Sequence, residues 1–85
     1  MTTLVDTHCH LDEKNCPEGA DAVIARARAA GVEAFVTVGV GRDLAPAREA
    51  VALAERVACV VATVGVHPHD AAGCDDAAFA EIERL

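Results

Sequence analysis

The sequence predicts an α/β protein built on a parallel sheet. Two nearly continuous runs of apolar, mostly β-branched residues, 33–40 and 58–66, are typical of strands covered on both faces. Segments in which apolar residues recur at helical spacing precede and follow these runs. The resulting order βαβαβα implies parallel strands joined by right-handed crossovers.

The first strand is expected over residues 3–10, with polar residues at its carboxyl end. A helix should follow it and begin near Pro17 and Glu18, because both residue types suit a helix start. Gly31 should end this helix. The apolar positions at helical spacing are Val23, Ile24, Ala27 and Ala30.

Two further helices complete the expected order. In the segment 42–57, Pro46 fits only within the first helical turn. A third helix is expected over 75–85, with Asp75 as its N-cap and Asp76 placed favourably for the helix dipole. The apolar face of the second helix should consist of Leu44, Ala47, Val51, Ala54 and Val57.

Composition and charge narrow the possible functions. The formal net charge is −7, and seven basic residues scattered among fourteen acidic ones make no patch that could grip nucleic acid by itself. Bound cations could still bring positive charge to a phosphate substrate. No signal peptide or membrane-spanning run is visible, and the four cysteines show no CxxC spacing. We therefore expect reduced thiols, a cytoplasmic location and no membrane partner.

The stretch "VDTHCHLD" at residues 5–12 carries the strongest chemical signal. Side chains alternate along a strand, so Asp6, His8 and His10 should share one face, and Cys9 should point the other way. The Cα atoms of the two histidines would lie about 6–7 Å apart, a separation from which both rings can reach one ion. The carboxyl ends of strands are where parallel α/β proteins place their sites. We therefore expect His8 and His10 to bind a divalent metal ion.

A second histidine-rich stretch, "VGVHPHDA" at residues 64–71, follows the third strand. His67 is expected to line the pocket and to contact an anionic substrate, although a solvated turn that caps the next helix would explain it too. His69 is left without a role. Gly39 and Gly41 form a single GxG, which a tight turn explains as well as a phosphate loop does, so no nucleotide site is predicted there.

These motifs together resemble the TatD family of metal-dependent hydrolases in the amidohydrolase superfamily. The resemblance is carried by "DTHCHLD", "VIARARAAGVEAFVTVG" and "VATVGVHPHDA". An HxH alone would also fit other amidohydrolases and the PHP phosphoesterases, and "GVHPH" favours TatD. The resemblance implies a TIM (β/α)8 barrel of about 250 residues. Residues 1–85 would then form a single partial domain, the three N-terminal βα units of a truncated barrel.

The same resemblance implies a mechanism. TatD-like enzymes use one or two divalent ions, here Mg, Mn or Zn, to activate water against phosphodiester bonds in DNA or another phosphodiester substrate, and members act as deoxyribonucleases. His8 and His10 would bind the first ion, and His67 would border the substrate phosphate. The family's other key groups come from later strands, which would lie beyond Leu85. No catalytic residue is therefore assigned within 1–85, and the 85-residue piece is expected to be inactive alone.

Two other functions remain open from the sequence. An amidohydrolase acting on a C–N or ester bond could begin with the same HxH motif. Alternatively, the chain could be a non-catalytic metal-binding remnant, or an assembly piece that pairs its open sheet edge with another chain. The sequence assigns neither the native metal nor an oligomeric state.

Overall fold

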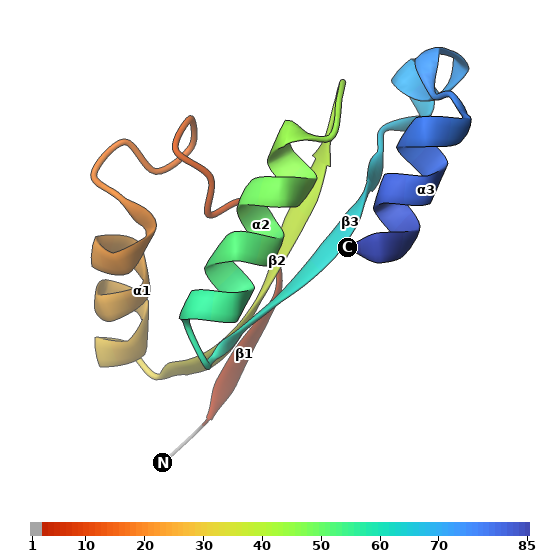
Figure 1. The fold of residues 1–85 in the computed structure, drawn as a ribbon. Coiled ribbons are helices and arrows are strands. Elements are labelled where there is room, and N and C mark those ends of the chain that lie inside the picture. Colours follow the sequence, from red (N-terminus) through yellow and green to blue (C-terminus); the bar gives the residue numbers. More distant parts are fainter. Residues whose placement is uncertain (1–2) are drawn as a thin grey trace.

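Three parallel strands form one open sheet in the order β1–β2–β3, as Figure 1 shows. The computed structural model describes residues 3–85. The parallel α/β order predicted from the sequence is confirmed, with one addition, the 3-10 helix η1 after β3. The elements are β1 (Leu4–Cys9), α1 (Ala20–Ala29), β2 (Val32–Gly41), α2 (Ala45–Arg56), β3 (Val60–Val66), η1 (Pro68–Gly73) and α3 (Asp76–Arg84).

The core lies between the sheet and the two helices α1 and α2. Phe35 of β2 and Val60 of β3 meet Ile24 of α1 and Leu53 of α2 in one buried cluster, which also takes in Leu11 and Cys16. Both helices therefore cover the same face of the sheet (Figure 1). This arrangement is what two successive right-handed crossovers produce.

The other face of the sheet is much more open. Val5 in β1 is 55% exposed and Val61 in β3 is 59% exposed. Along β2, buried residues alternate with partly buried ones. The expectation that both apolar strands are covered on both faces is therefore wrong for residues 3–85, because α1 and α2 pack on a single face.

Helix α1 begins three residues later than the sequence pattern predicts. Gly19 is the N-cap and has a φ of 94°, a left-handed conformation that glycine adopts without strain. Pro17 and Glu18 thus belong to the preceding turn, where Glu18 pairs with Arg26 of the helix at 2.7 Å. Gly31, with a φ of 109°, follows the helix as predicted.

The face that α2 turns to the sheet was predicted in part. Pro46 lies in the first turn, as expected. Of the predicted positions, Leu44 and Ala47 are buried. The helix also buries Ala50 and Leu53, which were not predicted. Small residues face the strands here because Gly39 of β2 has no side chain, which allows α2 to approach the sheet closely.

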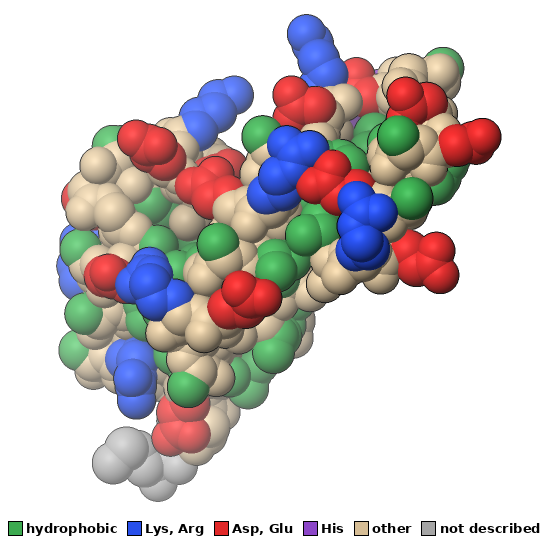
Figure 2. All heavy atoms as spheres, in the orientation of Figure 1, with side chains coloured by type: hydrophobic (Ala, Val, Ile, Leu, Met, Phe, Trp, Pro, Cys, Tyr) green, Lys and Arg blue, Asp and Glu red, His purple; other side chains and the backbone are tan. Residues whose placement is uncertain are grey.

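Charged side chains cover the helical side of the molecule without separating by sign. Figure 2 shows acidic and basic side chains interspersed on this face. The absence of a basic patch on the visible face agrees with the net charge of −7. No helix within residues 3–85 is both long enough and apolar enough to cross a membrane.

The third helix was expected over 75–85, and α3 runs from Asp76 to Arg84. Leu85 is instead the C-cap, a residue that is only half within the helix. Its N–H still donates a hydrogen bond to the Glu81 carbonyl oxygen at 3.0 Å, so the last turn is closed.

Asp75 caps α3, as predicted, by accepting a hydrogen bond from the Ala78 N–H at 2.8 Å. Replacing Asp75 with alanine should weaken the helix by about 1 kcal/mol, because the first turn loses its side-chain acceptor. The expected readout is faster hydrogen exchange of the Ala78 amide. Asp76→Ala is the matched control, since Asp76 lies in the same turn without making this bond. Equal exchange in the two variants would rule out the cap.

Candidate metal centre

The predicted site residues gather at the carboxyl edge of the sheet. His8 lies in β1 and His10 directly after its end, and His67 follows the end of β3. All three strands run in the same direction, so these ends share one edge (Figure 1). Parallel α/β proteins bind their ligands at this edge.

The structure brings His8 and His10 together. Their ring centroids are 5.3 Å apart, with the ring planes at 75°. Both side chains are exposed. With a Zn–N bond of about 2.1 Å, two imidazoles on one tetrahedral ion would have centroids about 5 Å apart. The observed separation thus fits two ligands of a single ion.

No third ligand joins this pair in the described part of the chain. Within residues 3–85, no group of three His, Cys, Asp or Glu side chains is arranged to hold a metal ion. The nearby Asp6 carboxylate accepts a hydrogen bond from the His8 main-chain N–H at 3.1 Å, so it helps to hold the end of the strand. Metal binding by His8 and His10 stays a prediction.

Leu85 takes no part in the candidate site. It marks the position beyond which the family resemblance places the remaining catalytic groups, and in the structure it is the C-cap of α3. Its side chain is aliphatic and 37% exposed, so it offers neither a metal ligand nor a hydrogen-bonding group. The assignment of the catalytic groups to later strands stays a prediction.

Two side chains fix the main chain beside His10. The Thr37 hydroxyl accepts a hydrogen bond from the Leu11 N–H at 3.2 Å, and the Cys16 thiol donates to the His10 carbonyl oxygen at 3.4 Å. Neither contact was predicted from the sequence. One signal was available, because Thr37 is the one hydroxyl-bearing residue in the otherwise apolar run "FVTVGVG".

The cysteines near the histidines are poor metal ligands at neutral pH. Cys9 is partly buried, and its thiol donates to the Val36 carbonyl oxygen at 3.4 Å. Burial, followed by the charges of Asp6 and Cys16, raises the pKa of Cys9 from 9.0 to about 11. Burial likewise raises the pKa of Cys16. Because of these raised pKa values, both sulfurs stay protonated at neutral pH and serve as hydrogen-bond donors. Metals bind the thiolate form, which is scarce under these conditions.

The raised pKa of Cys9 predicts a loss of stability in alkali. Folding stabilises the protonated thiol, so this contribution is complete below pH 9.0 and disappears as the pH rises through about 11. The chain has no Tyr and a single lysine, Lys14, so the other groups that titrate in this window are mainly thiols, among them Cys16 with its raised pKa. The urea midpoint should fall from pH 9 to 11, and less steeply in Cys9→Ser. Identical slopes would contradict the assignment to Cys9.

His67 is the N-cap of η1, a structure that the sequence predicted only as a loop. Its ring Nδ1 accepts a hydrogen bond from the main-chain N–H of His69 at 3.1 Å. The main-chain N–H of His67 donates to the Gly41 carbonyl oxygen at 3.3 Å. A neutral imidazole that accepts at Nδ1 carries its proton on Nε2. His67 therefore caps a turn and also offers an Nε2–H donor.

The structure does not bring His67 next to the His8–His10 pair. Strand β2 lies between β1 and β3, so the two outer strands are about 10 Å apart. The His67 and His69 rings lie near each other instead, with centroids 4.6 Å apart. A substrate group reaching from the pair to His67 would have to cross the end of β2.

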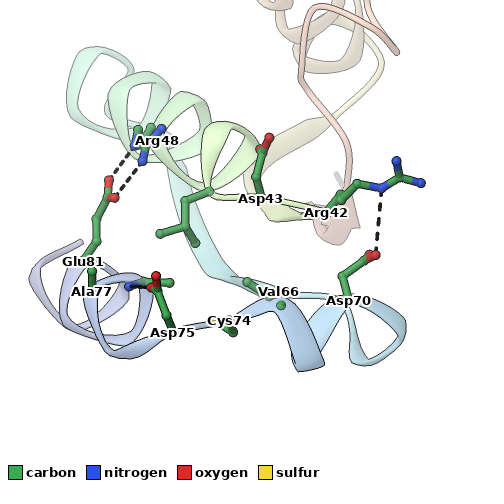
Figure 3. A pocket seen from close by; sticks show the side chains of 12 residues that line it. Arg42, Asp43, Arg48, Val66, Asp70, Cys74, Asp75, Ala77 and Glu81 are labelled. Atoms are coloured by element: carbon green, nitrogen blue, oxygen red, sulfur yellow. Dashed lines mark hydrogen bonds and ion pairs between the residues drawn. The ribbon is translucent and has the colours of Figure 1, made fainter.

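A cavity of about 380 Å³ lies between α2 and the segment formed by η1 and α3 (Figure 3). Four of its charged side chains form two ion pairs: the Arg48 guanidinium binds both carboxylate oxygens of Glu81, and Arg42 lies 3.9 Å from Asp70. None of the three predicted site histidines lines it. The Arg42 side chain is 93% exposed.

Comparison with known proteins identifies the chain's relatives. The sequence model of the family "TatD related DNase" matches residues 5–85. The chain is 46% identical to an uncharacterized metal-dependent hydrolase TatD of Mycobacterium tuberculosis, over 96% of this chain and 31% of that protein. It is 43% identical to a 3'-5' ssDNA/RNA exonuclease TatD of Cronobacter turicensis, over 96% and 30%. The chain thus spans under a third of the length of these relatives.

Proposed function

Because this chain belongs to the TatD-related DNase family, we propose that it contributes the first metal-binding strand of a metal-dependent hydrolase that cleaves phosphodiester bonds in nucleic acid. Two kinds of relatives support the proposal. Some are named metal-dependent hydrolases and others 3'-5' ssDNA/RNA exonucleases. The three βα units of the structure correspond to the start of a TIM-type barrel, the fold that the resemblance implies.

The observation that carries the proposal is the paired placement of His8 and His10. Their rings lie 5.3 Å apart at the carboxyl end of β1, where both can bind one divalent ion, which we propose to be Mg, Mn or Zn. When bound, such an ion supplies an activated water near neutral pH and positive charge at the phosphate. The histidines contribute by holding the ion at the edge of the sheet.

His67 is proposed to bind a phosphate oxygen of DNA or RNA. Its Nδ1 is engaged by the His69 N–H, which leaves the Nε2–H as the donor. An anionic phosphate oxygen accepts hydrogen bonds, so it requires a hydrogen-bond donor such as this one. The chain's net charge of −7 would otherwise repel a polyanion, so the bound ions and this donor together make the edge suitable for a phosphodiester.

A cytoplasmic location is part of the proposal. All four cysteines, Cys9, Cys16, Cys59 and Cys74, are free thiols. Free thiols are typical of proteins kept in a reducing compartment.

The test uses the natural polypeptide that carries this sequence. After removal of metals with a chelator, it should shorten a 5′-labelled single-stranded DNA or RNA from the 3′ end when Mg, Mn or Zn is restored. A parallel panel of amide, ester and lactone substrates covers the wider superfamily. Metal-dependent hydrolysis of that panel with the nucleic acids left intact would replace the nuclease proposal by an amidohydrolase one.

The role of His67 can be separated from its capping role by two substitutions. His67→Asn places an oxygen acceptor near Nδ1 and removes the Nε2–H, whereas His67→Gln places a donor near Nε2 and removes the cap acceptor. We expect His67→Asn to lower kcat/KM about tenfold or more, the size of one hydrogen bond to a charged oxygen. His67→Gln should retain more activity and weaken η1. Unchanged kinetics in His67→Asn would exclude a phosphate contact.

A further inference from the structure

The peptide unit between His10 and Leu11 is held from both sides by side chains. Its carbonyl oxygen accepts from the Cys16 thiol, and its N–H donates to the Thr37 hydroxyl. Both partners are almost fully buried, with 2% of Thr37 and 6% of Cys16 exposed. Because both polar groups of this peptide are hydrogen-bonded, the peptide plane cannot rotate without breaking one of the two hydrogen bonds.

These contacts begin where the β-ladder ends. The last pair between β1 and β2 joins Cys9 to Thr37, so the sheet provides no main-chain partner for the Leu11 N–H. The Thr37 hydroxyl takes that place from a position 26 residues away in the chain. The register is also irregular between Asp6 and Cys9, so regular pairing does not orient the segment that carries His8.

Thr37 is unusual for its position. Among residues 3–85 it is the single buried polar residue, and its neighbours Val36 and Val38 are aliphatic. Burying a hydroxyl in such surroundings is unfavourable unless the hydroxyl forms a hydrogen bond. Valine has nearly the same shape and would pack there without that requirement. The hydroxyl is therefore explained by its bond to the residue that follows His10.

We propose that Thr37 and Cys16 are positioning residues that fix the His10–Leu11 peptide plane and so aim the His10 imidazole at the ion it shares with His8. This inference rests on the proposed function, since it assigns the orientation of the proposed ligands. The hydrogen bonds of Thr37 and Cys16 go to the main chain and not to either ring. They act through the main chain, as the outer groups around a metal centre commonly do.

The test titrates the metal-free natural polypeptide with Co²⁺ and follows its visible absorption bands. Thr37→Val keeps the side-chain shape and removes the acceptor, whereas Thr37→Ser keeps the acceptor and removes a methyl group. We expect Thr37→Val to weaken Co²⁺ binding about tenfold and to change the absorption bands. The Co²⁺ affinity of Thr37→Ser should be within about twofold of the wild-type affinity, even if the loss of a buried methyl group makes the variant less stable. Thr63→Val, an exposed site on β3, is the control.

Cys16 gives an independent measurement. Cys16→Ala removes the donor and should weaken Co²⁺ binding, and Cys16→Ser should restore part of it. Cys59→Ala, at a partly buried cysteine that packs against the core, should leave the affinity unchanged. If Thr37→Val and Cys16→Ala bind Co²⁺ as tightly as their controls, the positioning role is wrong.

A metal-free readout separates this inference from the proposed function. If the wild type binds no Co²⁺, the proposed function fails. NMR of the metal-free protein then decides the positioning role. Thr37→Val should abolish the exchange protection of the Leu11 amide and shift the His10 ring resonances, whereas Thr37→Ser should preserve both. Unchanged spectra in Thr37→Val would overturn the inference.

Discussion

Replacing His8 and His10 together with alanine should lower the affinity of the natural polypeptide for divalent metal by more than a hundredfold. Both rings lie at the carboxyl end of β1 with centroids 5.3 Å apart, and the double substitution removes both proposed ligands of one ion. Loss of a single outer-shell partner already costs about 10- to 100-fold in metal affinity, so loss of two direct ligands should cost more. Titration with Co²⁺ or Zn²⁺ measures the change.

His69→Ala is the control for this experiment. His69 is also an exposed histidine at the carboxyl edge of the sheet, but it lies beside His67 after β3. Its substitution should leave metal affinity unchanged. Each single variant, His8→Ala and His10→Ala, should be intermediate between the wild type and the double variant. A double variant that binds metal as tightly as His69→Ala would show that the ion lies elsewhere, and the proposed mechanism would lose its basis.

Most of the fold was predictable because it depends on patterns that act within one element. The apolar runs of β2 and β3 and the helical spacing between them are local, and so is the Asp75 cap of α3. The start of α1 was predicted too early because proline and an acidic residue are common at helix starts. The actual N-cap is Gly19, whose left-handed φ depends on the path of the preceding turn. The buried face of α2 also depends on Gly39 in a different element, so helical periodicity assigned it only in part.

The candidate site was predicted in part for the same reason. Alternation along a strand predicts that the rings of His8 and His10 lie on one side, and the structure has their centroids 5.3 Å apart. The contacts that hold the peptide after His10 come from Thr37 on another strand and from Cys16 in a turn, and their pairing is a property of the folded chain. For His67, the sequence offered either a pocket role or a place in a solvated turn before the next helix. The structure shows His67 exposed and capping η1, and its pocket role is still a proposal.

Gly39→Ala should strongly destabilise the chain. A Cβ at this position would lie 2.8 Å from the Ala50 Cβ, 2.8 Å from the Thr63 carbonyl oxygen and 2.9 Å from the Ala47 Cα. Two of these atoms belong to the main chain, so no side-chain rotation relieves the clash. Overpacking of this kind costs about 1–3 kcal/mol or more, a large share of the roughly 5–15 kcal/mol that stabilises a small domain.

Gly65→Ala provides the matched control, because it adds the same methyl group to a neighbouring strand. There the new Cβ would meet only the Val40 Cγ2, at an ordinary 3.9 Å. We expect its urea midpoint to stay near the wild-type value and that of Gly39→Ala to fall well below it. If the two variants unfolded at the same urea concentration, α2 would be able to move away from β2 and β3 at little cost. Close packing at Gly39 would then not be what selects the alanine-rich face of α2.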